Sequence, residues 1–244
     1  MLSLENLITD TRAHNESDFY RKRWGTHTIF SDLPVTSRSD LALCPLSQRS
    51  YKKEQGLMKV VYAGELFFLS AWSFADIAQE AYGTSSKRPL VYFKNPYETI
   101  EKAMWCYLNG MVPLSGEINA DIAMLAARAY QIDSLITDPA SVDSLAPYLR
   151  ERTEPLSSIS FIAESFEREQ IAHYSQYAKR SRLVLSLPET GAFAEAKFSE
   201  NAAFTPLPNC SIEKGDTLIL TKATSLITPI IRYDTGIPAA ALSL

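Results

Sequence analysis

Short apolar segments alternate with longer segments of helical periodicity through the middle of this chain, and this alternation constrains its fold most. The apolar segments are bounded by turn-forming residues, which predicts strands. The predicted strands are 90–93, 111–114, 134–137, 158–163 and 183–187, and the predicted helices between them are 96–108, 119–130, 138–149 and 167–177. Strands and helices in this order form βαβ units. The sequence therefore predicts an α/β fold with a mainly parallel sheet and flanking helices.

The pattern changes after Glu189, where no convincing helix is found. The strand-like segments there are 192–198, 203–207, 217–221 and 229–233. Gly215-Asp216 is a turn signal before the third of them. We therefore expect residues 189–244 to form a small antiparallel barrel or sheet, attached to an α/β region of residues 1–188.

The region before residue 83 is less regular. Its pattern predicts helices at 4–24, 37–41 and 73–82, a loop at 43–59, a strand at 59–63 and an apolar segment at 66–72. Ser37 is the expected N-cap of the second helix.

Composition excludes several classes of protein. With 46% hydrophobic residues the chain can bury a large core, and with 24 basic against 28 acidic residues it offers no electrostatic case for nucleic-acid binding. Its 3 cysteines are far apart, so we expect reduced thiols and no zinc site. The N-terminus lacks a signal-peptide pattern and no apolar run approaches ~18 residues. We expect a cytoplasmic protein without a membrane partner.

Several common catalytic motifs are absent. The sequence has no Gly-x-Gly-x-x-Gly after a strand, no Walker A loop and no Gly-x-Ser-x-Gly elbow. His14, His27 and His173 are isolated, without metal-ligand spacing.

Four segments, taken in order, resemble a known family. They are 14–21 (HNESDFYR) followed by 33–36 (LPVT) and 40–41 (DL), then 83–89 (GTSSKRP), then 187–191 (LPETG), and last 215–221 (GDTLILT) followed by 228–236 (TPIIRYDTG). This order resembles the adenylate-forming (AMP-binding) superfamily, specifically its phenylacetate–CoA ligase branch. The last segment carries the resemblance most strongly. The alternative is an unrelated α/β domain with fortuitous matches.

The resemblance implies a phosphate-binding loop. The positions that match it are Gly83, Thr84, Ser85, Ser86 and Lys87, whose hydroxyls, backbone N–H groups and ammonium would surround the ATP phosphates. A second glycine of the family pattern is missing and Arg88 precedes Pro89. The alternative is a polar turn before a strand.

The resemblance also assigns the segment after the strand at 183–187. Glu189 would bind Mg²⁺ and Thr190 would contact the α-phosphate, which makes them the candidate catalytic residues. The family's Tyr-Gly before this glutamate is replaced by Ser186-Leu187, so the adenine-stacking aromatic is missing. Glu164 would line the nucleotide site or be an exposed loop acid.

The last segment departs from the family at one position. The family's Thr-Gly-Asp, whose aspartate takes both ribose hydroxyls, is Thr235-Gly236-Ile237 here. Isoleucine accepts no hydrogen bond, and an unpaired buried hydroxyl costs about 1–3 kcal/mol. Asp234 is the candidate substitute, if the backbone is displaced. Arg232 is a further nucleotide-contact candidate, or it holds the hairpin together.

The chain also ends at Leu244, before the mobile, lysine-bearing C-terminal domain that the family normally has. Two hypotheses follow. The first is a degenerate homologue with a binding or assembly role. The second is a minimal ligase that uses ATP and Mg²⁺ to activate a carboxylic acid as acyl-AMP, and transfers the acyl group to CoA or a carrier-protein thiol. A partner chain would then supply the missing lysine, and homodimerisation is implied by the resemblance.

Overall fold

The computed structural model describes residues 16–27, 29–51, 57–63, 66–80, 82, 86–115, 120–199, 201–208, 210–222 and 228–243. The chain divides into two compact units made of interleaved segments. Unit 1 comprises Met1–Asp76, Pro188–Gly191 and Pro206–Ala239, and unit 2 comprises Ile77–Leu187, Ala192–Thr205 and Ala240–Leu244. The sequence analysis expected a boundary at residue 188, and that boundary stays a prediction.

Unit 2 is built around a six-stranded sheet with the strand order β3-β4-β5-β6-β7-β8. The strands are β3 (Pro89–Tyr92), β4 (Ser134–Thr137), β5 (Ser158–Ala163), β6 (Ser181–Leu187), β7 (Gly191–Lys197) and β8 (Thr205–Pro206). β3 to β6 are parallel, and β3 and β4 are buried along their whole length, as parallel strands covered on both faces must be. The predicted α/β fold with a mainly parallel sheet is confirmed.

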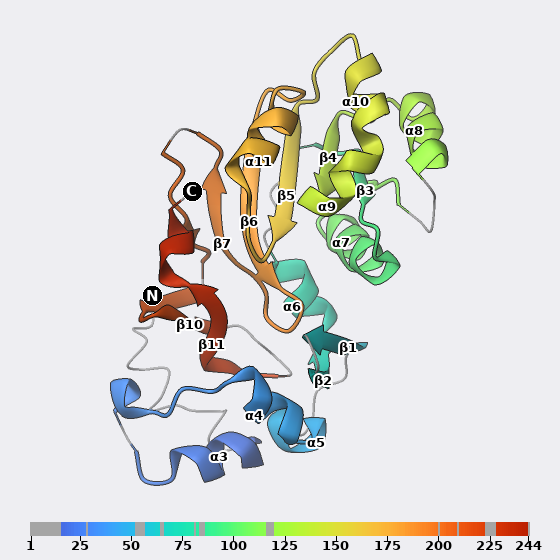
Figure 1. The fold of residues 1–244 in the computed structure, drawn as a ribbon. Coiled ribbons are helices and arrows are strands. Elements are labelled where there is room, and N and C mark those ends of the chain that lie inside the picture. The colour runs from blue at the N-terminus through green and yellow to red at the C-terminus, as the bar shows by residue number, and fades with distance from the viewer. Residues whose placement is uncertain are drawn as a thin grey trace. The chain divides into compact units, whose positions relative to one another are not determined.

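Helices connect and cover these strands. They are α7 (Pro96–Leu108), α8 (Ala120–Ala129), α9 (Pro139–Val142), α10 (Ala146–Glu151) and α11 (Arg168–Ser175), with 3-10 turns at Asp143–Leu145 and Ala239–Leu242. α7 packs against β3, and α9 packs against both β5 and α11 (Figure 1). Asn95 and Asp138 cap the first turns of α7 and α9, and each is followed by a proline at the first helical position.

Two predicted strands differ in the structure. Residues 111–114 form only one bridge, from Leu114 to Leu90. Pro113 has no N–H with which to extend the sheet, so this segment stays at the sheet edge. The predicted strands at 192–198 and 203–207 correspond to β7 and β8, which join the six-stranded sheet instead of the C-terminal one. β7 follows β6 after a three-residue turn, which requires an antiparallel pair.

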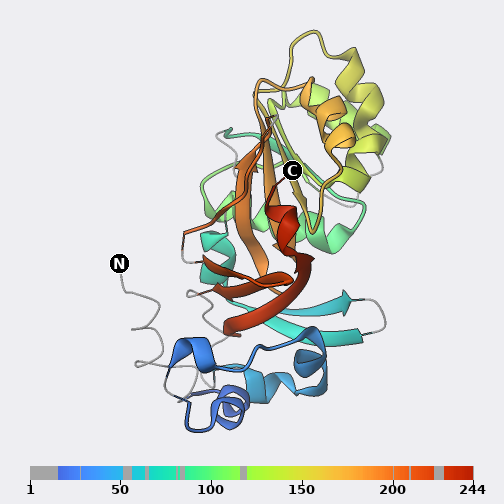
Figure 2. The ribbon, with the colours of Figure 1, turned by 60° about the vertical axis from the view of Figure 1, so that its left-hand side comes forward.

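Unit 1 contains the C-terminal antiparallel sheet, with the order β11-β10-β9. Its strands are β9 (Cys210–Lys214), β10 (Thr217–Lys222) and β11 (Ile230–Pro238). A separate antiparallel pair, β1 (Leu57–Ala63) and β2 (Leu66–Trp72), is visible in Figure 2. The helices are α3 (Asp18–Trp24), α4 (Arg38–Leu43) and α5 (Leu46–Arg49), with a 3-10 turn at Phe30–Asp32, and α6 (Phe74–Gln79) crosses into unit 2.

The expected loop at 43–59 is wrong in two places, because it contains α5 and the beginning of β1. Polar residues in short helices give little hydrophobic periodicity, which explains the error. The predicted helix at 4–24 is described only from residue 16, and α3 is confirmed as its last part.

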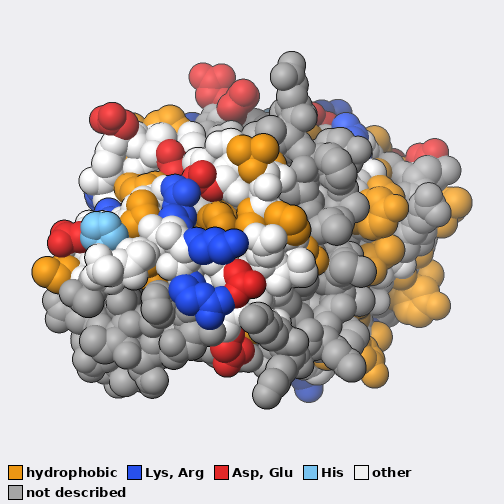
Figure 3. Space-filling model, turned by 90° about the horizontal axis from the view of Figure 1, so that it is seen from below, with side chains coloured by type: hydrophobic (Ala, Val, Ile, Leu, Met, Phe, Trp, Pro, Cys, Tyr) orange, Lys and Arg blue, Asp and Glu red, His pale blue; other side chains and the backbone are white. Residues whose placement is uncertain are grey.

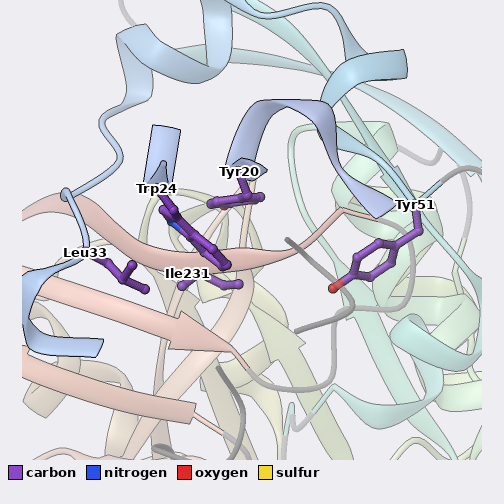
Figure 4. Packing of buried hydrophobic residues seen from close by; sticks show 5 residues of the cluster. All are labelled: Tyr20, Trp24, Leu33, Tyr51 and Ile231. Atoms are coloured by element: carbon purple, nitrogen blue, oxygen red, sulfur yellow. The ribbon is translucent and has the colours of Figure 1, made fainter. Parts of the chain in front are cut away.

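A small core holds the described N-terminal segment to β11 within unit 1. It consists of Tyr20, Trp24, Leu33, Tyr51 and Ile231 (Figure 4). Tyr20 and Trp24 are four residues apart on α3 and so share one face. The Tyr20 hydroxyl donates a hydrogen bond to the Pro229 carbonyl at 2.9 Å. This core fixes α3 on the strand that carries the last sequence motif.

The basic residues at the end of α3 are partly paired with acids. Arg21 pairs with Asp18 and Arg23 with Asp40. On the face shown in Figure 3, Lys and Arg side chains are interspersed with Asp and Glu side chains in the described part. The more exposed Arg21–Asp18 pair contributes little to stability.

Candidate functional site

Glu189 is the centre of a buried polar cluster within unit 1. Its residue is 2% exposed. Arg38 Nε donates a hydrogen bond to Glu189 Oε1 at 2.8 Å, and Arg38 Nη2 forms an ion pair with the same oxygen at 2.8 Å. The Tyr233 hydroxyl donates to this oxygen at 2.5 Å. Glu189 thus has a cation and a phenol as partners on one carboxylate oxygen.

Local structure explains how these three residues meet. Ser37 and Asp40 form a capping box, so Arg38 is the first residue of α4. Thr36 bridges to Tyr233, with backbone hydrogen bonds from Thr36 N to Arg232 O at 2.7 Å and from Asp234 N to Thr36 O at 2.8 Å. This places the start of α4 beside the inward-facing Tyr233. The turn 188–190 between β6 and β7 supplies Glu189.

The charge states in the cluster follow from its burial. Burial and the neighbouring Glu189 raise the pKa of the Tyr233 phenol far above its usual value, so it stays protonated and donates to the carboxylate. Burial lowers the pKa of Arg38, but the Glu189 charge more than offsets this and the net pKa is raised. Arg38 is therefore a permanent counter-charge.

The second oxygen of Glu189 is different. Glu189 Oε2 is buried and has no hydrogen-bond partner within the part of the chain that the structure describes. Buried carboxylate oxygens are normally paired, so this atom needs a donor or a cation from outside those residues.

Thr190 lies next to this cluster in the same turn. It is 1% exposed, and its hydroxyl donates to the Gly191 carbonyl at 3.1 Å. Lys222 Nζ donates to the Thr190 carbonyl at 3.0 Å and lies 5.3 Å from the centre of the Trp72 ring. Gly191 has φ +69°, a conformation that favours glycine at the end of this turn.

The two other candidates from the last motif are engaged elsewhere in unit 1. The Arg232 guanidinium makes a two-pronged pair with Glu213 at 3.1 and 3.0 Å, and donates to the carbonyls of Ser31 and Leu33. Arg232 has φ +43°, at a register shift between β10 and β11. These contacts hold β11 to β9 and to residues 31–33.

Asp234 is likewise occupied. Its Oδ1 accepts hydrogen bonds from the Thr217 hydroxyl at 2.7 Å and from Gly236 N at 2.9 Å. Ile237, three positions later, is 6% exposed and lies on the inward-facing side of β11 with Tyr233 and Thr235. Ile237, where the sequence departs from the family motif, is therefore a packed apolar side chain.

The remaining candidates lie in unit 2. Gly83, Thr84 and Ser85 lie outside the described residues. Ser86 is 7% exposed, accepts a hydrogen bond from Arg88 N at 3.0 Å and hydrogen-bonds to Asp133, while Lys87 is exposed. Glu164 is exposed and follows β5 directly.

Sequence reasoning missed Arg38 and Lys222 as members of the site. Arg38 pairs with a residue 151 positions away. Its position directly after the Ser37 cap, between the motif segments 33–36 and 40–41, was the only signal in the sequence. Lys222 ends β10 and offered none.

The residues present are a poor fit for a resident metal ion. No group of three or more His, Cys, Asp or Glu side chains among the described residues could hold one. Glu189 offers one unpaired oxygen, but Arg38 already balances its charge. Mg²⁺ prefers several oxygen ligands in an octahedral arrangement.

No family model and no curated protein matches the chain. Solved structures do match. A 2-hydroxyisobutyryl-CoA ligase, in an open conformation with 2-HIB-AMP and CoA, is 14% identical with a TM-score of 0.71, over 98% of this chain and 70% of that one. Coronafacic acid ligase from Pectobacterium brasiliense is 11% identical with a TM-score of 0.52, over 72% of this chain and 41% of that one.

A variant of E. coli MenE with bound OSB-AMS is 9% identical with a TM-score of 0.51, over 72% of this chain and 42% of that one. The fold is that of the adenylate-forming ligases. The chain spans 64% of the 2-hydroxyisobutyryl-CoA ligase in its postadenylation state. At these identities the likeness establishes the fold, while activity and substrates need separate argument. Helices in the described part of the chain lack the length and hydropathy to cross a bilayer.

Proposed function

We propose that this chain is a degenerate homologue of the acyl-adenylate-forming ligases, of the phenylacetate–CoA ligase-like branch. Its ATP-dependent activity is weak or lost, and its role is binding or assembly in the cytoplasm. The state of Glu189 carries the proposal. The carboxylate assigned to Mg²⁺ by resemblance is already paired with Arg38 and Tyr233. An incoming metal would have to compete with a guanidinium that stays charged at all ordinary pH values.

Ile237 supports the same proposal. A ribose placed against a buried isoleucine would leave its hydroxyls without an acceptor, which weakens nucleotide binding by about 1–3 kcal/mol for each unpaired group. Asp234 would have to give up its bonds to Thr217 and Gly236 to substitute. In this proposal the chain still binds AMP or a small carboxylic acid weakly, and associates with a second copy or a partner chain.

One observation favours the alternative, a minimal ligase. Glu189 Oε2 is buried and without a partner among the described residues, so one oxygen is available for a bound cation. Such an enzyme would join a carboxylic acid to ATP, giving acyl-AMP and pyrophosphate. The thiol of CoA or a carrier protein would then attack the acyl carbon and release AMP. A partner chain would supply the lysine that stabilises charge in the first step.

Calorimetric titration with ATP and AMP, with and without Mg²⁺, separates the two candidates. The proposal predicts weak nucleotide binding that Mg²⁺ does not strengthen, and no acid-dependent exchange of pyrophosphate into ATP. Mg²⁺-dependent ATP binding that Glu189→Gln abolishes, with acid-dependent exchange, would overturn it in favour of the ligase. Glu154→Gln is the matched control, because Glu154 is an exposed carboxylate in unit 2.

A further inference from the structure

Unit 2 contains a large cavity at the amino ends of β5 and β6. Its volume is about 1060 Å³. Its described walls are the first residues of the two strands, Ser175 of α11, the segment 178–180 before β6, the end of β7, and residues 198–199, 201–203 and 205. We call it the amino-end cavity. Glu164 follows the opposite, carboxyl end of β5, roughly 20 Å away along the strand.

The wall of the amino-end cavity is fixed by backbone hydrogen bonds. Ile159 N donates to Arg180 O at 2.9 Å, Lys179 N to Leu156 O at 2.8 Å and Phe198 N to Ser181 O at 3.0 Å. These bonds hold the backbone of this wall to the sheet.

Positive charge is concentrated in this wall. Lys179, Arg180, Arg182 and Lys197 line it, and Glu195 is the one carboxylate among the described lining residues, although the whole chain has a net charge of -4. Arg182 forms an ion pair with Glu195. The exposed ammonium groups of Lys179 and Lys197 have no ion-pair partner in the described part of the chain. A concave surface lined by one sign of charge attracts ligands of the other sign.

Three serine hydroxyls in the same wall are unpaired. Ser158, Ser175 and Ser181 each have a buried Oγ with no hydrogen-bond partner among the residues described, and Ser158 is 7% exposed. Buried hydroxyls are usually satisfied. These three hydroxyl oxygens have almost no exposed surface, so the donors open to a phosphate are the exposed ammonium groups of Lys179 and Lys197.

We propose that the amino-end cavity binds a phosphorylated organic anion of about nucleotide size, with its phosphate held by the ammonium groups of Lys179 and Lys197. Inorganic phosphate alone would leave most of the volume empty, since cavities of this size suit whole organic ligands. Ala196, Phe198 and Ala202 supply apolar surface for the organic part. This site is independent of the function proposed for Glu189.

Calorimetry of the full chain with inorganic phosphate and with uridine 5′-monophosphate tests the proposal. We expect the nucleotide to bind more tightly than phosphate, and the double variant Lys179→Gln/Lys197→Gln to lose at least tenfold in affinity for both, because each charged hydrogen bond accounts for about that much. The control Lys94→Gln/Lys214→Gln removes the same charge from exposed positions outside the cavity and should bind as the unmodified chain does.

Equal affinities in the two double variants, or no binding at millimolar concentrations, would overturn the proposal. Preference for an acidic peptide over both phosphate probes would also overturn it. A second measurement needs no variant. Acylation of the unmodified chain, followed by mass spectrometry, should show Lys179 and Lys197 protected by uridine 5′-monophosphate while Lys94 reacts as before. Unchanged reactivity of all three lysines would also overturn the proposal.

Discussion

Replacing Arg38 with methionine tests whether the Glu189 cluster is held together by charge. The substitution keeps the aliphatic length of the side chain and removes both N–H contacts to Glu189 Oε1, each 2.8 Å long. Glu189 then remains as a buried charge without its cation. Breaking a fully buried ion pair costs about 3–5 kcal/mol. The Arg38 side chain is 29% exposed, so water replaces part of the lost interaction.

We therefore expect Arg38→Met to lower the free energy of unfolding by about 2–3 kcal/mol. With an m-value of about 3 kcal/mol/M for a chain of this size, the urea midpoint should fall by about 0.8 M. Tryptophan fluorescence reports the transition.

The matched control is Arg21→Met, which breaks the exposed pair with Asp18 and should cost less than 1 kcal/mol. A double variant, Arg38→Met/Glu189→Gln, should be less destabilised than Arg38→Met alone, because it leaves no buried charge behind. The reasoning is refuted if Arg38→Met costs no more than the control, or if the double variant loses as much as the two single losses combined.

The other predictions concern single buried groups. Tyr233→Phe should destabilise the protein by about 2 kcal/mol in urea unfolding, because it removes a hydrogen bond to the charged Glu189. Burial raises the pKa of the Cys106 thiol to about 12, so Cys106 should resist a thiol reagent at pH 8 until the chain is unfolded, as mass spectrometry of the labelled chain would show. Burial and the hydrogen bond to Asp143 raise the pKa of Tyr174 from 10.0 to about 12, so its contribution to stability is present below pH 10 and lost as the pH rises to 12. Denaturation of Tyr174→Phe in that range should show a smaller fall in stability than the unmodified chain.

The strands of the parallel sheet could be predicted because their sequence signal is local. The strand 134–137 and the strand 158–163 were predicted with the bounds that β4 and β5 have. Both are short apolar runs between turn residues, and both are buried on each face. β9 was missed because its sequence, CSIEK, has little apolar periodicity and its residues are mostly half-buried.

Which sheet a strand joins was harder to predict, because strand pairing depends on non-local contacts. The segments at 192–198 and 203–207 have the composition of the C-terminal antiparallel strands, yet β7 and β8 extend the large sheet. The turn at 188–190 decides this, since it folds β7 back on β6. The same turn carries Glu189, so the strand connection and the candidate site depend on the same few residues.

The candidate site depends on non-local contacts even more than strand pairing does. The motif positions predicted that Glu189 and the segment around Tyr233 would belong to the site. The charge balance at Glu189, however, depends on Arg38, which is 151 positions away in the sequence. Position 237 shows that a residue can suit the fold without suiting a ligand. An aspartate there would bury a charge that only a bound ligand could satisfy, whereas Ile237 gains free energy by packing, about 2 kcal/mol for a side chain of this size. An isoleucine at this position therefore stabilises the fold by packing. A fold shared with solved ligase structures is for that reason weak evidence for a shared reaction, and the pairing of Glu189 with Arg38 is the better guide.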